Sequence, residues 1–428
     1  MIIEPFLDRN IIEFKSDNIY FEINEPKFEK VILKLDRDYE KQNGYFTILY
    51  LNNEYKLYYR ACPFSYYKDK KKKITYSTEE LSPHEYFCLA TSKDGLNFKK
   101  KNYNIIKYNN SFDNNILIHD YYCHNFYPFY DKKNNNYFGL SGTSFFGKGI
   151  NLFKSSNGID WKYQSKILDE TYLLPGWSHP NHFDSHNCIV YNDKDDHYYI
   201  YVRNNKPNQR FVQYTKTKDL INFTKCRDIN ILNNNNMILY TPGIFKYENT
   251  NYYLSIPSVV GKSLDLKSNS VLMVSTDCIN FNILTKNLFK TNNDNKTSMN
   301  INSIVPSHDN KKMYIYSHHN TIENEYISCH SFEKDRIQKI VCNDYGSIKT
   351  NLIELHNKLY INYDTFNNGY IEIQIKDVNN TIILDTIKFY NSSYNLEIKW
   401  NNNYTMTNGN YHIKFKMYNC ILYSFSYD

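Results

Sequence analysis

The sequence predicts an all-β protein, namely a five-bladed β-propeller followed by a small antiparallel β-sandwich. Three observations support this fold. A short turn-forming phrase recurs about every sixty residues, a hairpin-like stretch precedes each copy, and the pattern changes after Gly346. The 428 residues allow a large core, and 17% of them are aromatic, which favours strands.

The recurring phrase predicts the outer half of each blade. Its copies are SKDGLNF at 92–98, SSNGIDW at 155–161, TKDLINF at 217–223 and STDCINF at 275–281, with a weaker fifth copy, ISCHSFEKDRIQKI, at 327–340. The aromatic residues that close the first four copies are 63, 62 and 58 residues apart. An alternating stretch precedes each copy, so the phrase indicates a strand, a tight Asp/Asn/Gly turn and an outer strand that begins at the aromatic residue.

Upstream of each phrase lies a predicted hairpin. The five hairpins span residues 45–60, 126–142, 188–203, 243–257 and 303–318. Hairpin and phrase together give four strands per unit, and five such units at this period are typical of a five-bladed propeller. We expect this domain over residues 36–345, and we expect the possible strands within 1–35 to close the ring or to pack beneath it.

After residue 345 the rhythm changes. Short alternating stretches such as YIEIQIKDV and YNLEIKW follow one another to the C-terminus. They predict a separate antiparallel β-sandwich over residues 346–428, packed against the outer edge of the propeller, with Trp400 in its core.

Charge and hydropathy exclude several classes of partner. The net charge is only +6, and the one dense basic run, Lys68 to Lys73, is typical of a solvated loop, so we expect no nucleic-acid partner. No run approaches the ~18 apolar residues of a membrane span. The start, MIIEPFLDRN, lacks the apolar core of a signal peptide. We therefore expect no membrane partner, synthesis inside the cell without a signal peptide, and a location in the cytoplasm or, for a viral protein, association with the virion.

The sequence predicts no metal and no cofactor. None of the nine cysteines forms a C-x-x-C pair, which argues against a structural zinc site. His182 and His186 could bind a metal together with Asp184, but without a further acidic ligand plain hydrogen bonding is favoured.

Polar residues gather where the first strand of each predicted blade begins. First strands line the central channel of a propeller, and their starting ends open onto one shared funnel. The residues at these places are Asp36, Asp38 and Glu40 for blade one, Asp120, His124 and Asn125 for blade two, Asp184, His186 and Asn187 for blade three, Tyr240 for blade four, and Asn300 and Asn302 for blade five. Arg60 and Arg203 stand at matching places on second strands, and Arg210 opens a third strand.

A funnel of this composition suits glycoside hydrolysis. The reaction needs two carboxyl groups across the scissile bond, one a protonated donor and the other a nucleophile or base. Arginines and neutral amides would hold sugar hydroxyls and tune the pKa values of the carboxyl groups. The aromatic rings of Phe126, Trp177 and Tyr240 could stack on sugar faces.

The central residues also have structural interpretations. Asp184 is typical of an Asx turn, and Glu40 of a solvated loop acid. Arg60 and Arg203 are equally compatible with ion pairs between blades.

The order of these motifs resembles a bacterial group of glycoside-hydrolase-like proteins that is related to glycoside hydrolase families 32 and 43. The shared order is YYRA, TSKDGLNF, NNI, HNFYPFYD, SSNGIDW, FDSHN, YVRN and TKDLINF, followed by GSIKT, LYINYDTFNNGYIEIQI, IKW and LYSFSY. The resemblance runs from about residue 36 to the end. It implies a five-bladed propeller with a C-terminal β-sandwich.

The resemblance also implies pocket positions for nine residues: Glu40, Arg60, Asn114, Asn115, His124, Asn125, Asp184, Asn187 and Arg203. Asp184 and Glu40 are then the expected acid–base or nucleophilic pair. Phe126, His186, Arg210 and Tyr240 complete the predicted substrate-binding set. The sequence departs from family 32, because it has no N-D-P-like start, R-D-P or E-C, and blade two has His124 and Asn125 where an acid is common.

Three functions remain open from the sequence. The leading hypothesis is a hydrolase of O-glycosidic bonds in an oligo- or polysaccharide, with Asp184 and Glu40 as its carboxyl groups. The alternatives are a carbohydrate-binding propeller without catalysis and a purely structural or protein-interaction propeller. A gap of about 5 to 10 Å between the two carboxyl groups across an open pocket favours hydrolysis, and a side chain that points away favours binding alone.

Overall fold

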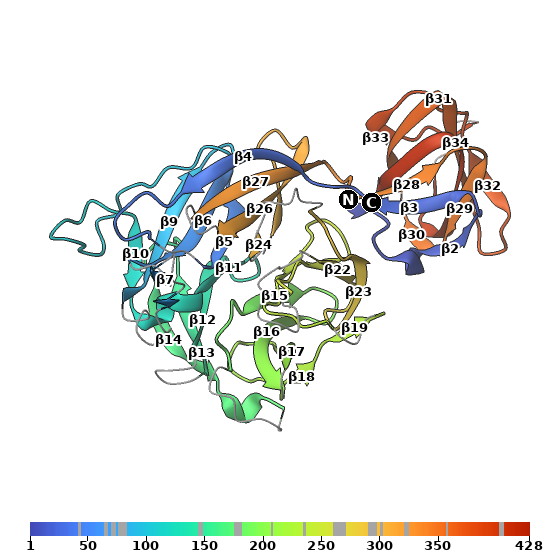
Figure 1. Cartoon of the computed structure of the whole chain (residues 1–428). Helices are drawn as coiled ribbons and strands as arrows, with labels where there is room; N and C mark the ends of the chain where they lie inside the picture. Colours follow the sequence, from blue (N-terminus) through green and yellow to red (C-terminus); the bar gives the residue numbers. More distant parts are fainter. Residues whose placement is uncertain are drawn as a thin grey trace.

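Five antiparallel sheets arranged in a ring form the larger part of the molecule, and a second β domain lies beside the ring (Figure 1). The computed structural model describes residues 1–41, 44–63, 67–69, 74–75, 84–143, 149–174, 182–206, 209–233, 237–259, 271–289, 298–299, 303–320, 325–356, 358–401 and 406–428. Within these ranges, no helix is both long enough and apolar enough to cross a membrane. Of the basic run, Lys70 to Lys73 lie outside the described residues.

The first three blades have four strands each, and every blade starts at the channel. Their strands are β5 (Phe46–Leu51), β6 (Glu54–Ala61), β9 (Tyr86–Ser92) and β10 (Ile116–His119); β11 (Tyr127–Asp131), β12 (Asn136–Thr143), β13 (Gly149–Ser155) and β14 (Lys162–Leu168); and β15 (Cys188–Asn192), β16 (His197–Lys206), β17 (Gln209–Thr217) and β18 (Arg227–Asp228). Neighbouring first strands contact one another around the channel, β11 with β5 and β15 among them. The starting ends of the first strands are thus brought close together.

Blades four and five each carry an additional short strand. Their strands are β20 (Ile244–Lys246), β21 (Tyr253–Ser255), β22 (Leu272–Ser275) and β23 (Asn280–Thr285) with β19 (Asn230–Leu232); and β25 (Ile304–Pro306), β26 (Lys312–Asn320), β27 (Glu325–Glu333) and β4 (Lys27–Lys34) with β24 (Ser298–Met299). The remaining short elements are the hairpin β7 (Tyr67–Asp69) and β8 (Ile74–Thr75) and the 3-10 turns η1 (Arg9–Ile11), η3 (Tyr121–Asn125) and η4 (Glu170–Tyr172).

The outer strand of blade five comes from the N-terminal region. Strand β4 pairs antiparallel with β27, so the first strand of the ring in sequence closes the last blade. The weaker fifth copy of the phrase predicts that the end of 327–340 supplies this strand, and that prediction is wrong: Gln338–Cys342 form β28, which pairs with β3 and β34 in the second domain. Pairing the ends of the ring removes an exposed sheet edge, which explains why β4 takes this place.

The recurring phrase forms the same tight turn in successive blades, as predicted. Oδ1 of Asp94 accepts hydrogen bonds from the amides of Leu96 and Asn97 at 2.9 and 2.8 Å. Oδ1 of Asp277 accepts from the amides two and three residues on at the same two distances. The side chain therefore replaces backbone partners within the turn, which is the reason for the Asp at this place.

The outer strands follow the prediction in two blades and depart from it in two. β14 begins directly after Trp161, and Phe281 lies in β23. Phe98 and Phe223 lie outside the strands, and the outer strands β10 and β18 begin later in the chain. Local alternation indicates that an outer strand exists, but its start depends on where the preceding strand offers free hydrogen-bonding groups.

The second domain is one ten-stranded sheet that curls into a sandwich-like structure, which confirms the predicted fold class. Its strands are β1 (Ile2–Glu4), β2 (Ile12–Lys15), β3 (Ile19–Ile23), β28, β29 (Gly346–Thr350), β30 (Ile353–Leu355), β31 (Leu359–Lys376), β32 (Ile382–Asp385), β33 (Ser393–Glu397) and β34 (Gly409–Tyr427). The long strands β31 and β34 pair with bulges that let them bend. The curled sheet encloses an apolar core, against which Trp400 packs half-buried.

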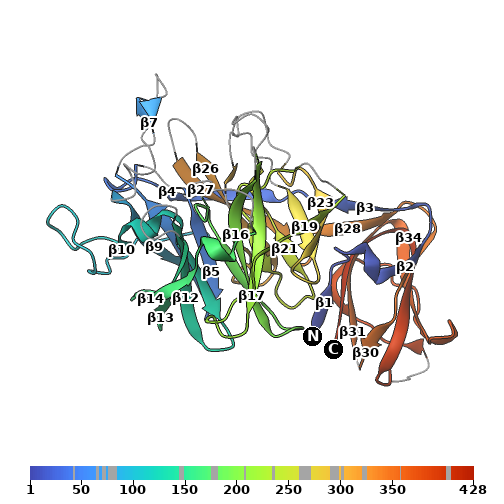
Figure 2. The ribbon, with the colours of Figure 1, turned by 90° about the horizontal axis from the view of Figure 1, so that it is seen from below.

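The second domain is attached to blades four and five. The amide of Ile3 donates to the carbonyl of Asn249 at 2.7 Å, and the Tyr252 hydroxyl donates to Glu4 at 2.7 Å. Figure 2 shows the second domain beside the ring, with both termini at the junction. Strand β1 pairs with the end of β34, so the two termini lie together.

Candidate active site

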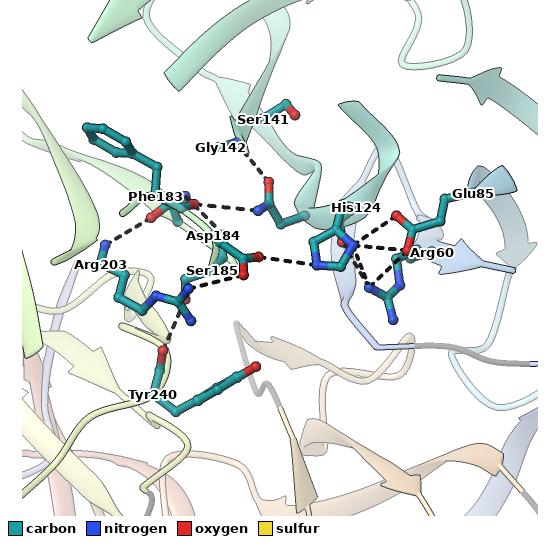
Figure 3. A network of polar contacts seen from close by, with 12 residues as sticks. Arg60, Glu85, His124, Ser141, Gly142, Phe183, Asp184, Ser185, Arg203 and Tyr240 are labelled. Atoms are coloured by element: carbon teal, nitrogen blue, oxygen red, sulfur yellow. Dashed lines mark hydrogen bonds and ion pairs between the residues drawn. The ribbon is translucent and has the colours of Figure 1, made fainter. Parts of the chain in front are cut away.

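Side chains from three blades meet where the first strands begin (Figure 3). Arg60 lies near the end of β6, and Glu85 directly precedes β9 of the same blade. His124 belongs to turn η3, which leads into blade two. Asp184 lies in the turn before β15, and Arg203 lies on β16. The ring topology brings these five residues together although 143 positions separate the first from the last.

His124 bridges two carboxylates. Its Nδ1 lies 2.9 Å from both carboxylate oxygens of Glu85, and its Nε2 lies 3.2 Å from Oδ1 of Asp184. Arg60 reaches Glu85 at 3.5 Å, and Arg203 reaches the other oxygen of Asp184 at 3.2 Å. The five residues form a row of alternating charge, which we call the charge chain: Arg60, Glu85, His124, Asp184 and Arg203.

The charge chain keeps its members ionised in spite of burial. Burial alone would lower the pKa of His124, but the charge of Glu85 and the hydrogen bond to Asp184 raise the pKa to about 9. Burial would raise the pKa of Asp184, yet the hydrogen bond and charge of His124 and the charge of Arg203 hold it well below its ordinary range. Burial acts in the same direction on Glu85, and the charges of His124 and Arg60 lower its pKa overall. At neutral pH, His124 is an imidazolium between two carboxylates.

Only the middle of the charge chain is open to solvent. The side chains of Asp184 and His124 are 17% and 12% exposed, whereas those of Arg60 and Arg203 are 3% and 2% exposed and Glu85 is fully buried. A ligand can therefore contact Asp184 and His124, while Glu85 acts on a ligand only through His124.

Two predicted asparagines hold the turn that carries Asp184. Nδ2 of Asn187 donates to the carbonyls of Phe183 and Ser185 at 2.7 and 2.9 Å. Oδ1 of Asn125 accepts from the amide of Gly142 at 2.8 Å, and its Nδ2 reaches the Phe183 carbonyl at 3.5 Å. Phe183 has a φ of 64°, a strained value for a bulky residue that such bonds can maintain. Both asparagines are buried and hold the turn that carries Asp184, and their contact with substrate stays a prediction.

His186 and Phe126 support the site from within the core. The His186 ring stacks on Tyr45 with centroids 4.9 Å apart, and burial lowers its pKa to about 3. Phe126 is 3% exposed and packs against Phe87 and Trp161. Both rings are buried, and their predicted roles in binding stay predictions. Trp177, Asn300 and Asn302 lie outside the described residues.

Glu40 does not belong to the charge chain. Its carboxylate accepts from the Tyr59 hydroxyl at 2.5 Å and pairs with Lys100 at 2.5 Å, and it also accepts from two backbone amides of its own loop. Tyr59 and Arg60 are neighbours on β6, so their side chains point to opposite faces of the sheet. Glu40 therefore lies on the other side of blade one from Arg60, and the predicted pairing of Glu40 with Asp184 is corrected.

Asn114 and Asn115 also have structural roles in blade one. Nδ2 of Asn115 donates to the Tyr59 hydroxyl at 2.7 Å and to the carbonyl of Leu89 at 3.0 Å. Nδ2 of Asn114 donates to the carbonyl of Ile106 at 2.7 Å. Both are buried, and Asn115 lies on the Glu40 side of β6, so the structure does not bring them to the charge chain and their place in a pocket stays a prediction.

Tyr240 and Arg210 lie next to the charge chain on the side of blade four. Tyr240 is half-buried, and its ring lies 4.7 Å from the guanidinium carbon of Arg210 and 5.8 Å from that of Arg203. The structure thus places Tyr240 next to Arg203, the last member of the charge chain, and Arg210 on the Tyr240 ring.

Glu85 is the member of the charge chain that the sequence interpretation missed. It directly precedes a third strand, whereas the acids considered were those before first strands. One signal was present: Arg60 pairs across the sheet with Phe87, so an acid two residues before Phe87 must lie close to Arg60.

The sequence left open a metal site formed by His182, His186 and Asp184. Across the ranges that the structure describes, no three His, Cys, Asp or Glu side chains are grouped so that they could hold a metal ion. His124 and Asp184 instead contact each other directly.

Comparison with known proteins shows which solved structures resemble the fold. No protein-family model matches the sequence, and no curated protein matches it. Among solved structures, the RGII complex of BT0996 is 11% identical with a TM-score of 0.50, and the match covers 73% of the present protein and 92% of BT0996. A structure described as a glycoside hydrolase is 10% identical with a TM-score of 0.50, and the match covers 73% of the present protein and 94% of that hydrolase.

A third match is an arabinoxylan arabinofuranohydrolase of glycoside hydrolase family 43 from Bacillus subtilis, in complex with cellotetraose. It is 11% identical with a TM-score of 0.45, and the match covers 91% of the present protein and 96% of that enzyme. The predicted likeness to glycoside hydrolases is thus confirmed at the level of the fold by the structure that is described as a glycoside hydrolase. The relation to family 32 stays a prediction. The protein has a propeller fold that it shares with a glycoside hydrolase of known structure.

Proposed function

We propose that the protein hydrolyses O-glycosidic bonds of an oligo- or polysaccharide at the exposed middle of the charge chain. The carrying observation is the arrangement of Asp184, His124 and Glu85: an imidazolium held between two ionised carboxylates, with only Asp184 and His124 within reach of a ligand. Glu40 points away from the site, so His124 replaces it as the expected proton donor beside Asp184. The fold shared with a glycoside hydrolase supports the same reaction class.

The two exposed groups have complementary roles. The Asp184 carboxylate is the base or nucleophile, and its charge favours the cationic, oxocarbenium-like transition state of the sugar. His124 is the proton donor to the leaving oxygen. Glu85 is a positioning residue, because its carboxylate partners among the described residues are His124 and Arg60, and it favours the protonated state of the ring.

Substrate must separate Asp184 from His124. At 3.2 Å their contact leaves no room for a glycosidic oxygen between them. When the sugar enters, His124 loses the Asp184 hydrogen bond that helps to raise its pKa. The pKa of the donor then moves down from about 9 towards neutrality, which is the range in which a general acid is most effective.

The reaction balances without a further group. The proton of His124 passes to the leaving oxygen as the glycosidic bond breaks. Water adds to the anomeric carbon, and its proton reaches Asp184. Once the products leave, the restored contact returns that proton to His124.

The test is release of reducing ends from a broad panel of oligosaccharides, with binding measured on the same panel by calorimetry. We expect the wild type to cleave at least one member and Asp184→Asn to lose at least about 10²-fold of that activity while it stays folded. Saturable binding without any cleavage by the wild type would overturn the proposal and would identify a carbohydrate-binding propeller.

A further inference from the structure

We propose that the sugar bound at this site is acidic and that Arg210, together with Asn205, binds its carboxylate. The inference rests on the proposed function and names the substrate class. Blades one and three carry different residues at equivalent positions, and this difference supports the inference.

Blades one and three place an arginine at the same point of the second strand. Arg60 pairs across the sheet with Phe87, and Arg203 pairs with Val212. Two residues before Phe87 lies Glu85, and two residues before Val212 lies Arg210. The position that supplies a carboxylate to Arg60 in blade one thus supplies a second cation in blade three.

Arg210 has an aromatic contact but no carboxylate. Its guanidinium stacks on the half-buried Tyr240 ring at 4.7 Å, on the site side of blade three. Among the residues that the structure describes, no Asp or Glu forms an ion pair with it. A stacked guanidinium keeps its planar fork of donors free for a bidentate carboxylate, which is the ligand that matches its geometry.

Asn205 adds a second, independent observation. It is the direct cross-strand partner of Arg210 and lies on the same face of blade three as Arg203. The side chain is 7% exposed, and its buried Nδ2 has no hydrogen-bond partner among the described residues. A buried donor without an acceptor is unfavourable, and a ligand oxygen at this place would satisfy it.

The net charge of the site also favours an acidic sugar. Four of its side chains are cationic, Arg60, His124, Arg203 and Arg210, and two are anionic, Glu85 and Asp184. The two carboxylates are already shared within the charge chain, so the site keeps an excess of two positive charges. An anionic sugar complements this excess, whereas a neutral sugar leaves Arg210 without a counter-ion.

The experiment compares uronic-acid oligosaccharides with the same oligosaccharides after chemical reduction of their carboxyl groups. Binding to the full-length protein is measured by calorimetry and cleavage by release of reducing ends. For the wild type we expect the uronic-acid form to bind at least tenfold more tightly than the reduced form. Arg210→Gln should remove this preference by lowering the affinity for the uronic-acid form at least about tenfold. Arg227→Gln, an exposed arginine on the outer strand of the same blade, is the matched control and should keep the preference.

A second variant keeps the proposal testable if Arg210→Gln folds poorly. Asn205→Asp places a carboxylate opposite Arg210, so it should occupy the guanidinium and abolish the preference without lowering the melting temperature. Equal wild-type affinity for both forms, or a preference that survives both variants, would overturn the inference. Tight binding of a sulfated neutral oligosaccharide instead would also overturn it, because the ligand would then not be a carboxylate.

The failures of the two proposals are distinguishable. Binding that prefers the uronic-acid form and depends on Arg210, without any cleavage, contradicts hydrolysis and supports the acidic ligand. Cleavage of neutral and acidic forms at equal rates contradicts the acidic ligand and supports hydrolysis.

Discussion

Blade one carries two buried carboxylates on opposite faces of β6, and the two differ in which blades supply their partners. Glu40 is satisfied entirely by groups of its own blade: the Tyr59 hydroxyl, the Lys100 ammonium and two loop amides. Glu85 faces the centre of the ring, where it shares a histidine from blade two with an aspartate from blade three. A buried acid whose partners all come from one blade stabilises that blade, whereas an acid linked to several blades shapes a shared site.

The largest effect should follow from removal of the proton donor. We expect His124→Gln to lower kcat/KM by 10²- to 10⁴-fold, because the amide cannot donate a proton in the transition state. The assay is release of reducing ends by protein whose circular dichroism matches that of the wild type. Activity within a factor of three of the wild type would remove His124 from the mechanism.

On the other face of β6, Glu40→Gln should weaken the fold rather than the reaction. Loss of this charge leaves the half-buried Lys100 without its closest partner, so the free energy of unfolding should fall by about 3 kcal/mol. Urea denaturation measures the change, and Lys41→Gln, at an exposed ion pair, should change it by less than about 1 kcal/mol. An unchanged stability would mean that the Glu40 cluster is not structural.

The sequence could be used to predict the fold, the turns and most of the charge chain, since His124, Asp184, Arg60 and Arg203 stand at places that the repeat makes equivalent. It could not separate Glu40 from Glu85. Both lie near an end of a blade-one strand, and the deciding fact is the face of β6 to which each side chain turns. That face depends on Tyr59 and Lys100, which are 41 positions apart and meet only in the folded blade.

The pH dependence of stability and of activity should reflect the titration of His124. Its pKa in the folded protein, about 9, lies above the ordinary value of 6.5, so its protonation stabilises the fold fully below pH 6.5, and that stabilisation is lost as the pH rises through 9. The lowered pKa values of Asp184 and Glu85 act in the opposite sense, and their contribution is present above the ordinary carboxyl pKa and lost in stronger acid. Activity of the free enzyme, measured as kcat/KM, should therefore fall on the alkaline side with an apparent pKa near 9.

The variant Glu85→Gln tests whether the charge of Glu85 raises the pKa of His124. Without the Glu85 charge the alkaline fall should move to lower pH by at least about one pH unit, while the conservative variant Glu85→Asp should restore part of the shift. A purely structural role of Glu85 would lower activity at every pH and leave the position of the fall unchanged.

The smallest effect concerns the repeated turn. Asp277→Ala removes the acceptor for two backbone amides, so we expect a loss of about 1 kcal/mol in unfolding free energy and unchanged kcat/KM. Thermal melting and the reducing-end assay on the same preparation check both statements. A change in kcat/KM would show that the turns affect the site.

The most direct test of the account compares Asp184→Asn with Glu40→Gln on one cleaved oligosaccharide, at equal concentrations of folded protein. The two carboxylates are equivalent candidates from the sequence, and the structure separates them. We predict that Asp184→Asn lowers kcat/KM by at least about 10²-fold and that Glu40→Gln changes it by less than about threefold. Loss of activity in Glu40→Gln with Asp184→Asn still active would contradict the charge chain as the active site.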